Sequence, residues 1–179
     1  MFKRLAPTWQ IESIYNLTAA DLHKNNIKVV LTDLDNTLIA WNNPDGTPEL
    51  RAWLRLMEEE KITVVVVSNN NHQRVKRAVG PLNLPFVSRA LKPLTRGIRQ
   101  AQKRYQVAND EVILVGDQLL TDVWAANNAQ IRSVLVKPIV ESDAWNTKIN
   151  RGIENLVKGS LYKQKLLSKN WRNSLDDRA

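Results

Sequence analysis

The run Ile62-Thr63-Val64-Val65-Val66-Val67 limits the possible folds of this chain more than any other stretch. All of its residues are β-branched, which favours an extended strand over a helix. Because the apolar residues are continuous rather than alternating, the strand is expected to be buried on both faces. Such strands are typical of parallel sheets covered by helices on both sides, so the sequence predicts an α/β fold.

Other short apolar runs repeat this pattern along the chain. Segments with apolar residues at helical spacing separate them, and Thr47-Pro48 reads as the N-cap and first residue of one such helix. This alternation predicts a three-layer, Rossmann-like open parallel sheet. Besides the run at 62–67, the predicted strands end at Asp33 and span residues 85–88, 112–115 and 131–136.

Composition excludes several kinds of site. The chain has 179 residues, 43% of them apolar and 25% charged, as expected for a globular domain with an extension. It has no cysteine, which removes disulfides, thiolate zinc sites and cysteine nucleophiles. The two histidines, His23 and His72, are too far apart in sequence to suggest a His-based triad or zinc cluster. No apolar run is long enough to span a bilayer and no secretory signal is visible, so a cytoplasmic location is expected.

Polar and acidic residues follow three of the predicted strands. Asp33 and Asp35 end the first one, and side chains two apart on an extended chain point to the same side. The carboxyl ends of parallel strands share one edge of the sheet, where α/β folds bind ligands. The sequence therefore predicts one site from these strand ends together with a lysine that precedes a helix: Asp33, Asp35, Ser68, Asn69, Lys92, Asp117 and Asp122.

Several carboxylates can share a small volume only if a cation joins them, and oxygen ligands suit Mg²⁺. We expect Asp33, Asp35, Asp117 and Asp122 to form this metal site. The metal would allow a carboxylate to approach a phosphate, which is also an anion.

A catalytic cycle follows from these groups. Asp33 would attack phosphorus, and Asp35 would protonate the leaving oxygen and later deprotonate a water. Ser68 would hydrogen-bond the phosphoryl group and Lys92 would neutralise its charge.

These motifs, in this order, resemble the haloacid dehalogenase (HAD) superfamily of phosphatases. The residues of these motifs are similar to those of its YqeG-like branch, HAD subfamily IIIA. That branch is related to mitochondrial phosphatidylglycerophosphate phosphatases. The resemblance covers roughly residues 10–155. It rests on Asp33-Leu34-Asp35-Asn36-Thr37, Ser68-Asn69-Asn70-Asn71, Lys92-Pro93-Leu94 and Gly116-Asp117-Gln118-Leu119-Leu120-Thr121-Asp122.

The resemblance implies five parallel strands in the order 5-4-1-2-3, with Asp33 on the central strand. In this superfamily a cap would be inserted after Asp35 or between Ser68 and Lys92, and both intervals are already filled by predicted helices and strands. We therefore expect no large cap domain and an open site, suited to phosphates on bulky or surface-bound molecules. Thr37, Asn69, Asn70 and Trp41 are expected to contact the phosphate or the substrate. For Asn70 the alternative is a helix cap, and for Trp41 it is pinning of the loop that carries it.

Residues 1–144 are expected to form the phosphatase domain, with 1–28 as an N-terminal segment, and 145–179 a basic amphipathic extension. Its expected apolar face comprises Trp145, Ile149, Ile153, Leu156 and Leu161, and seven positive residues accompany one acid, Glu154, between Trp145 and Arg172. Such a helix can lie on an anionic membrane, contact nucleic acid or dock on its own domain. The net charge of +8 favours anionic partners in general.

Three function classes remain after this reading. The favoured class is a Mg²⁺-dependent phosphomonoesterase, acting on phosphatidylglycerophosphate, on nucleic-acid ends or on phosphosugars. A phospho-acceptor switch would use similar groups, but there the lysine comes last, whereas here Lys92 precedes Asp117 and Asp122. A lipid- or nucleic-acid-binding adaptor is the third class. Peripheral membrane association and an oligomer that supplies a lid are left open.

Overall fold

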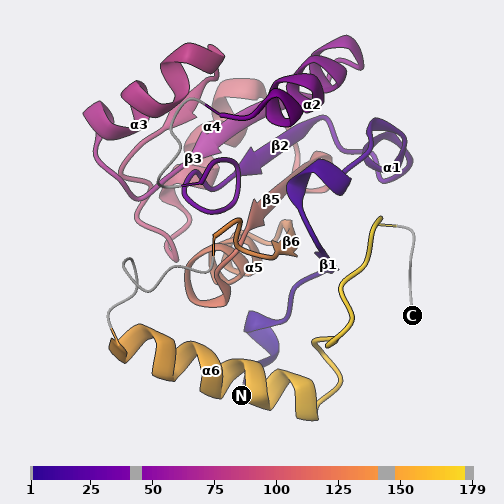
Figure 1. Ribbon diagram of the computed structural model, residues 1–179, viewed down its shortest axis with the longest axis vertical. Helices are drawn as coiled ribbons and strands as arrows, with labels where there is room; N and C mark the ends of the chain where they lie inside the picture. The colour runs from indigo at the N-terminus through magenta and orange to yellow at the C-terminus, as the bar shows by residue number, and fades with distance from the viewer. Residues whose placement is uncertain (1, 41–45, 141–147, 176–179) are drawn as a thin grey trace.

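One parallel sheet of six strands forms the centre of the computed structural model, which describes residues 2–40, 46–140 and 148–175 (Figure 1). The strand order is β1-β6-β5-β2-β3-β4, and each neighbouring pair is parallel. The strands are β1 (Trp9–Ile11), β2 (Val29–Thr32), β3 (Thr63–Val67), β4 (Phe86–Val87), β5 (Val112–Gly116) and β6 (Arg132–Val136). The α-helices are α1 (Ala19–Lys24), α2 (Pro48–Glu59), α3 (His72–Val79), α4 (Arg96–Tyr105), α5 (Trp124–Asn128) and α6 (Lys148–Lys163).

The five strands predicted from sequence keep the predicted order, with β2 in the middle of that set. The predicted strand number is wrong, because β1 adds a sixth strand at the edge beside β6, pairing Trp9 with Val134. Only three residues long and with Gln10 at its centre, β1 has neither the length nor the apolar run by which the other strands are recognised.

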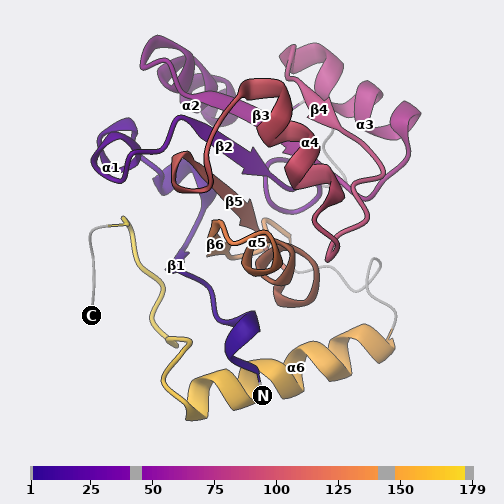
Figure 2. The same cartoon turned by 180° about the vertical axis from the view of Figure 1, so that it is seen from behind.

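Helices cover both faces of the sheet, as the continuous apolar run predicts. Val64 and Val66 of β3 belong to the core shared with α2 and α3, whereas Val65 and Val67 belong to the core shared with α4 and α5. Successive side chains of a strand point to opposite faces, so both sets can be buried only in a three-layer fold. Figures 1 and 2 show these helices on either side of the sheet.

Side-chain caps fix the starts of the helices around the sheet. The Thr47 hydroxyl accepts a hydrogen bond from the Leu50 amide at 3.2 Å, and Pro48 is the first residue of α2. This confirms the predicted start of α2 and places that helix over the core. Asn71, rather than Asn70, caps α3 by accepting from the Arg74 amide at 2.9 Å, so the side chain of Asn70 is available for other contacts.

The basic extension forms helix α6, which packs on the domain. Val157 and Leu161 are buried with residues of the N-terminal turn and of the segment after β5. Ile153 and Leu156 are 48% and 67% exposed, so the predicted apolar face is wrong at these two positions. Apolar residues lie on more than one side of α6, and the domain covers only the side that carries Val157 and Leu161. Trp145 lies outside the described residues.

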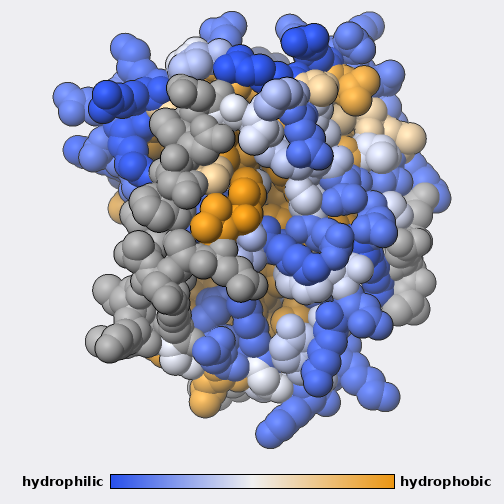
Figure 3. Space-filling view, in the orientation of Figure 1, coloured by the Kyte–Doolittle hydropathy of each residue, from blue (hydrophilic) through white to orange (hydrophobic). Residues whose placement is uncertain are grey.

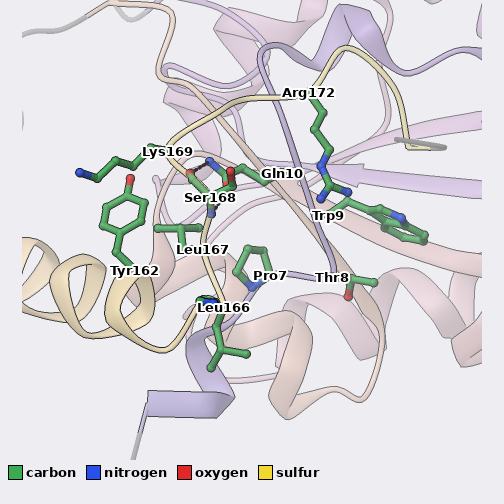
Figure 4. Close-up of a pocket in the computed structure, with 11 residues that line it drawn as sticks. Pro7, Thr8, Trp9, Gln10, Tyr162, Leu166, Leu167, Ser168, Lys169 and Arg172 are labelled. Carbon is green, nitrogen blue, oxygen red and sulfur yellow. Dashed lines mark hydrogen bonds between the residues drawn. The ribbon is translucent and has the colours of Figure 1, made fainter. Parts of the chain in front are cut away.

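After α6 the chain returns to the edge strand β1. The side-chain amide of Gln10 donates to the Ser168 carbonyl at 2.8 Å and accepts from the Ser168 amide at 3.1 Å (Figure 4). Arg172 then pairs with Ile11 as a parallel bridge. A cleft of about 480 Å³ lies between these segments. Among residues 2–40, 46–140 and 148–175, no helix has the length and apolar character needed to cross a membrane.

Candidate active site

The loop after β2 places two acids at the carboxyl edge of the sheet. The Asp33 amide donates to the Val115 carbonyl at 2.9 Å, which extends the pairing of β2 with β5 by one residue. The chain then closes on itself, since the Leu38 and Ile39 amides both donate to the Leu34 carbonyl. This tight closure keeps Asp35 largely buried although it lies in a loop. No inserted cap domain occurs in the described residues of this loop or of the 68–92 interval, as predicted.

Lys92 is at the centre of the site. Its ammonium donates to a carboxylate oxygen of Asp33 and to one of Asp122, both at 2.7 Å. The lysine side chain is only 2% exposed, and the pairing with the two acids raises its pKa above the ordinary range against the opposing effect of burial. The charged form of Lys92 is therefore favoured between Asp33, which follows β2, and Asp122, on the turn after β5.

Asn69 fixes the backbone that carries Lys92. Its side-chain amide donates to the Lys92 carbonyl at 3.0 Å, and its side-chain oxygen accepts from the Lys92 amide at 2.7 Å. The Asn69 side chain therefore holds Lys92 in place. The predicted contact between Asn69 and the phosphate stays a prediction.

Three carboxylates meet beside this lysine. Oxygens of Asp33, Asp117 and Asp122 all lie within 4.8 Å of one another. Thr37 donates to Asp117 at 3.1 Å, which ties the loop after β2 to the loop after β5.

The pKa values of the site acids reflect this crowding. Burial, followed by the charges of Asp122 and Asp33, raises the pKa of Asp117 well above its usual range. Burial also raises the pKa of Asp122, to about 6, against the pull of Lys92. Both shifts mean that the folded chain opposes the ionised form of these two carboxyls.

The position of Asp122 depends on a glycine and on a π-helical turn. Gly116 ends β5, and a Cβ at this position would lie 2.3 Å from the Asp122 side chain, so only glycine fits without displacement. The turn Leu119–Val123 carries Asp122, whose oxygen accepts from the Gln118 amide at 3.1 Å. Glu154 of α6 accepts from the Leu119 amide at 2.9 Å, so the C-terminal helix supports this turn.

Asp35 has different partners from the three clustered acids. Asn70 donates to one of its oxygens at 2.6 Å, and Arg74 donates to the other at 2.7 Å. The buried Ser68 hydroxyl accepts from the same Asn70 side chain at 3.1 Å. The second acid of the pair therefore faces one neutral donor, Asn70, and one arginine, a separate environment from that of Asp33.

The predicted site residues within the described ranges gather at this edge. Trp41 lies outside the described residues. Arg74 was missed from the sequence: it lies in the first turn of α3, and nothing in the local pattern marks it as a partner of Asp35. The one usable sequence signal is the Asn71 helix cap, which places Arg74 close to the end of β3 but does not identify its partner.

The donor set fits a hard divalent cation. Three carboxylates with one lysine leave two negative charges in a largely buried cluster, and oxygen ligands of this kind are those that Mg²⁺ prefers. A divalent cation would relieve the repulsion that raises the pKa of Asp117. Carboxylates of Asp33, Asp117 and Asp122 are close enough to hold it together, whereas the Asp35 carboxylate is engaged by Asn70 and Arg74. A part for Asp35 in the metal site stays a prediction.

Comparison with known proteins agrees with this geometry. A family model described as HAD-hydrolase-like matches residues 90–158. The chain is 37% identical over 159 residues to "Probable phosphatase YqeG" of Bacillus subtilis (strain 168), which covers 89% of this chain and 92% of that protein. A solved structure of an uncharacterized protein from Listeria monocytogenes serotype 4b has a similar fold, with a TM-score of 0.51 and 14% identity, over 74% of this chain and 99% of that one. The chain belongs to the haloacid dehalogenase superfamily of phosphatases, in its YqeG-like branch.

Proposed function

We propose that this protein is a Mg²⁺-dependent phosphomonoesterase that works through an aspartyl-phosphate on Asp33. The observation that carries the proposal is the pairing of Asp33 with the buried Lys92, inside a cluster of three carboxylates. A buried lysine that contacts the attacking carboxylate is well placed to neutralise the incoming phosphoryl group as well.

In the first half of the reaction, a carboxylate oxygen of Asp33 attacks phosphorus and the bond to the leaving oxygen breaks. Asp35 donates a proton to that oxygen, so the leaving group departs as a neutral alcohol. In the second half, Asp35 takes a proton from a water that attacks phosphorus. The bond between phosphorus and the Asp33 oxygen then breaks, which releases phosphate and restores both acids.

Other residues position these groups. Asn69 holds the Lys92 backbone, and Asn70 orients both Asp35 and Ser68. Ser68, with Thr37 and nearby backbone amides, is proposed to bind the phosphoryl oxygens. Mg²⁺, held by Asp33, Asp117 and Asp122, would supply positive charge for the phosphoryl oxygens when bound.

The proposed substrate is a phosphomonoester on a bulky or surface-bound molecule. Two features support this: no inserted cap lies over the site in the described residues, and the net charge is positive. Phosphatidylglycerophosphate fits both features and is suggested by the resemblance to its mitochondrial phosphatases. A nucleic-acid end or a phosphosugar is the alternative, and a cytoplasmic location stays an expectation.

The test is hydrolysis of p-nitrophenyl phosphate with and without Mg²⁺. Asp33→Asn should abolish turnover, whereas its circular dichroism and melting temperature should stay close to those of the parent. Asp35→Asn should lower turnover by ~10²–10⁴ on an alkyl phosphate, whose leaving group needs a proton. Full activity in Asp33→Asn, or turnover that survives EDTA, would contradict the proposal.

A further inference from the structure

Positive charge is concentrated in one continuous stretch of this chain. Between Glu60 and Asp110 there are ten lysine and arginine residues and no acid. Since the whole chain has a net charge of +8, the residues outside this stretch carry a net charge of −2. The stretch that contains Lys92 is therefore the largest source of positive charge in the chain, ahead of the basic extension 145–179, whose net charge is +5.

This stretch forms one side of the molecule. It comprises β3, α3, β4 and α4, and the two helices flank the edge strand β4 (Figure 2). In Figure 3 the side chains over α3, at the upper left, are strongly hydrophilic. Lys92 and Arg74 of this stretch pair with acids of the site, but the stretch supplies no carboxylate of its own to offset its other cations.

Apolar side chains are exposed where this side meets the site. Leu91 and Leu94 are 48% and 62% exposed, and they flank Lys92 in a turn closed by a hydrogen bond from the Leu94 amide to the Leu91 carbonyl at 2.8 Å. Lys92 points inward to the carboxylates while both leucines are open to solvent. Arg89 and Arg96, both exposed, lie on either side of this turn.

Two further exposed apolar residues lie at the same edge. Trp124 directly follows the turn that carries Asp122, and the Ile139 amide donates to the Asn36 carbonyl in the loop after β2. Four of the seven large hydrophobic side chains exposed in the described residues thus follow carboxyl ends of strands. We call this set the site rim: Arg89, Leu91, Leu94, Arg96, Trp124 and Ile139.

We propose that the site rim docks the protein on an anionic membrane, with its apolar side chains in the interface and its arginines at the headgroups. Exposed leucine and tryptophan beside arginine are the combination that peripheral proteins insert into such an interface. Nucleic acid is the weaker fit, because leucine cannot stack on bases and Trp124 is the only aromatic residue of the rim. Docking would bring the site to a lipid phosphate. In this respect the inference rests on the proposed function and narrows its substrate to a phosphate on a lipid.

The test is co-sedimentation of the full chain with vesicles of equimolar phosphatidylglycerol and phosphatidylcholine, compared with phosphatidylcholine alone. Binding should require the anionic lipid and should weaken with salt. The double variant Arg89→Gln/Arg96→Gln should bind about fivefold more weakly for each cation removed. Leu91→Gln/Leu94→Gln should bind the vesicles more weakly than the parent at every salt concentration. The lost contribution is apolar and is therefore not screened by salt.

Matched controls come from exposed residues outside the rim. Leu56→Gln removes a leucine of similar exposure, 55%, on α2, and Lys163→Gln/Lys169→Gln removes two charges from the C-terminal extension. Both controls should bind vesicles like the parent. Loss of binding in the extension variant but not in the rim variants would overturn the proposal, and so would the absence of vesicle binding by the parent at low salt. Tighter, rim-dependent binding to a single-stranded oligonucleotide than to vesicles would overturn the membrane as partner.

Hydrolysis of p-nitrophenyl phosphate separates this proposal from the proposed function. All four variants keep the residues assigned to chemistry, so their turnover of this soluble substrate should equal that of the parent. Vesicle binding is measured without turnover. An inactive protein that still binds through the rim would contradict the proposed function alone, and an active protein that does not bind would contradict the docking alone.

Discussion

At the scale of single residues, the site combines groups whose charges oppose one another. Asp122 is buried and Asp117 is partly exposed beside Asp33, and Lys92 compensates only part of their charge. The pKa of Asp122 rises from 3.8 to about 6, and that of Asp117 rises as well. Because the folded pKa values exceed those of the unfolded chain, the folded state binds more protons, and the stability of the metal-free protein should fall as pH rises from about 4 through 6.

Asp117→Asn should therefore stabilise the metal-free protein at neutral pH. The variant loses one unfavourable charge from the crowded cluster, and its melting temperature should rise by roughly 2–4 °C per kcal/mol gained. The gain should shrink near pH 4, where the parent carboxyl is protonated. Added Mg²⁺ should raise the melting temperature of the parent but have little effect on the variant.

A matched control for this change is Glu59→Gln, which removes an exposed carboxylate from α2. It should leave the melting temperature and its response to Mg²⁺ nearly unchanged. A fall in the stability of metal-free Asp117→Asn at pH 7 would show that the carboxylate is satisfied without a cation, and would contradict the description of the cluster as a metal site.

At the scale of secondary-structure elements, the sequence predicted the strands and helices whose apolar pattern is strong. The β-branched runs predicted five strands, and Thr47-Pro48 predicted the start of α2. Strand β1 was missed because its place at the sheet edge depends on contacts far along the chain: Thr8 bonds Ser133 of β6, and Gln10 bonds Ser168 after α6. The face of α6 was partly mispredicted for a similar reason: the sequence of a helix with apolar residues on several sides does not tell which side meets the domain.

The side of α6 that packs can be tested with two leucines on the same helix. Leu161 is fully buried and Leu156 is 67% exposed. Leu161→Ala should lower the free energy of unfolding by ~2–5 kcal/mol, as for other buried leucines. Leu156→Ala should change it by about 0.5 kcal/mol or less. Urea unfolding followed by circular dichroism measures both, and equal effects would contradict the observed packing.

Those residues of the site that directly follow strands could be predicted from the sequence. Parallel strands bring their carboxyl ends to one edge, so acids that follow β2 and β5 had to lie near each other. The contacts that orient those acids were not predictable in this way. The pairing of Arg74 with Asp35, and the reciprocal hydrogen bonds between Asn69 and Lys92, depend on loop conformations that no local pattern specifies.

At the scale of the whole molecule, the fold joins a buried acidic centre to a positively charged side. The sheet collects the acids at its carboxyl edge, and the acid-free stretch from β3 to α4 contributes ten lysine and arginine residues, Lys92 among them. The C-terminal helix contributes through Glu154, which supports the turn that carries Asp122. The residues proposed for catalysis, the proposed docking rim and the C-terminal helix thus meet at the same edge of the sheet.

The central claim, that Asp33 carries the phosphoryl group, can be tested directly in Asp35→Asn with p-nitrophenyl phosphate and Mg²⁺. Nitrophenolate leaves without a proton, so the first half of the reaction should proceed, while hydrolysis of the intermediate should be slow because its general base is absent. The reaction is quenched and reduced with borohydride, which converts an aspartyl-phosphate to homoserine, and the peptides are analysed by mass spectrometry. We expect a burst of nitrophenolate with homoserine at position 33 in Asp35→Asn, and neither in Asp33→Asn/Asp35→Asn. A burst with no label at position 33, or with the label on another residue, would contradict it.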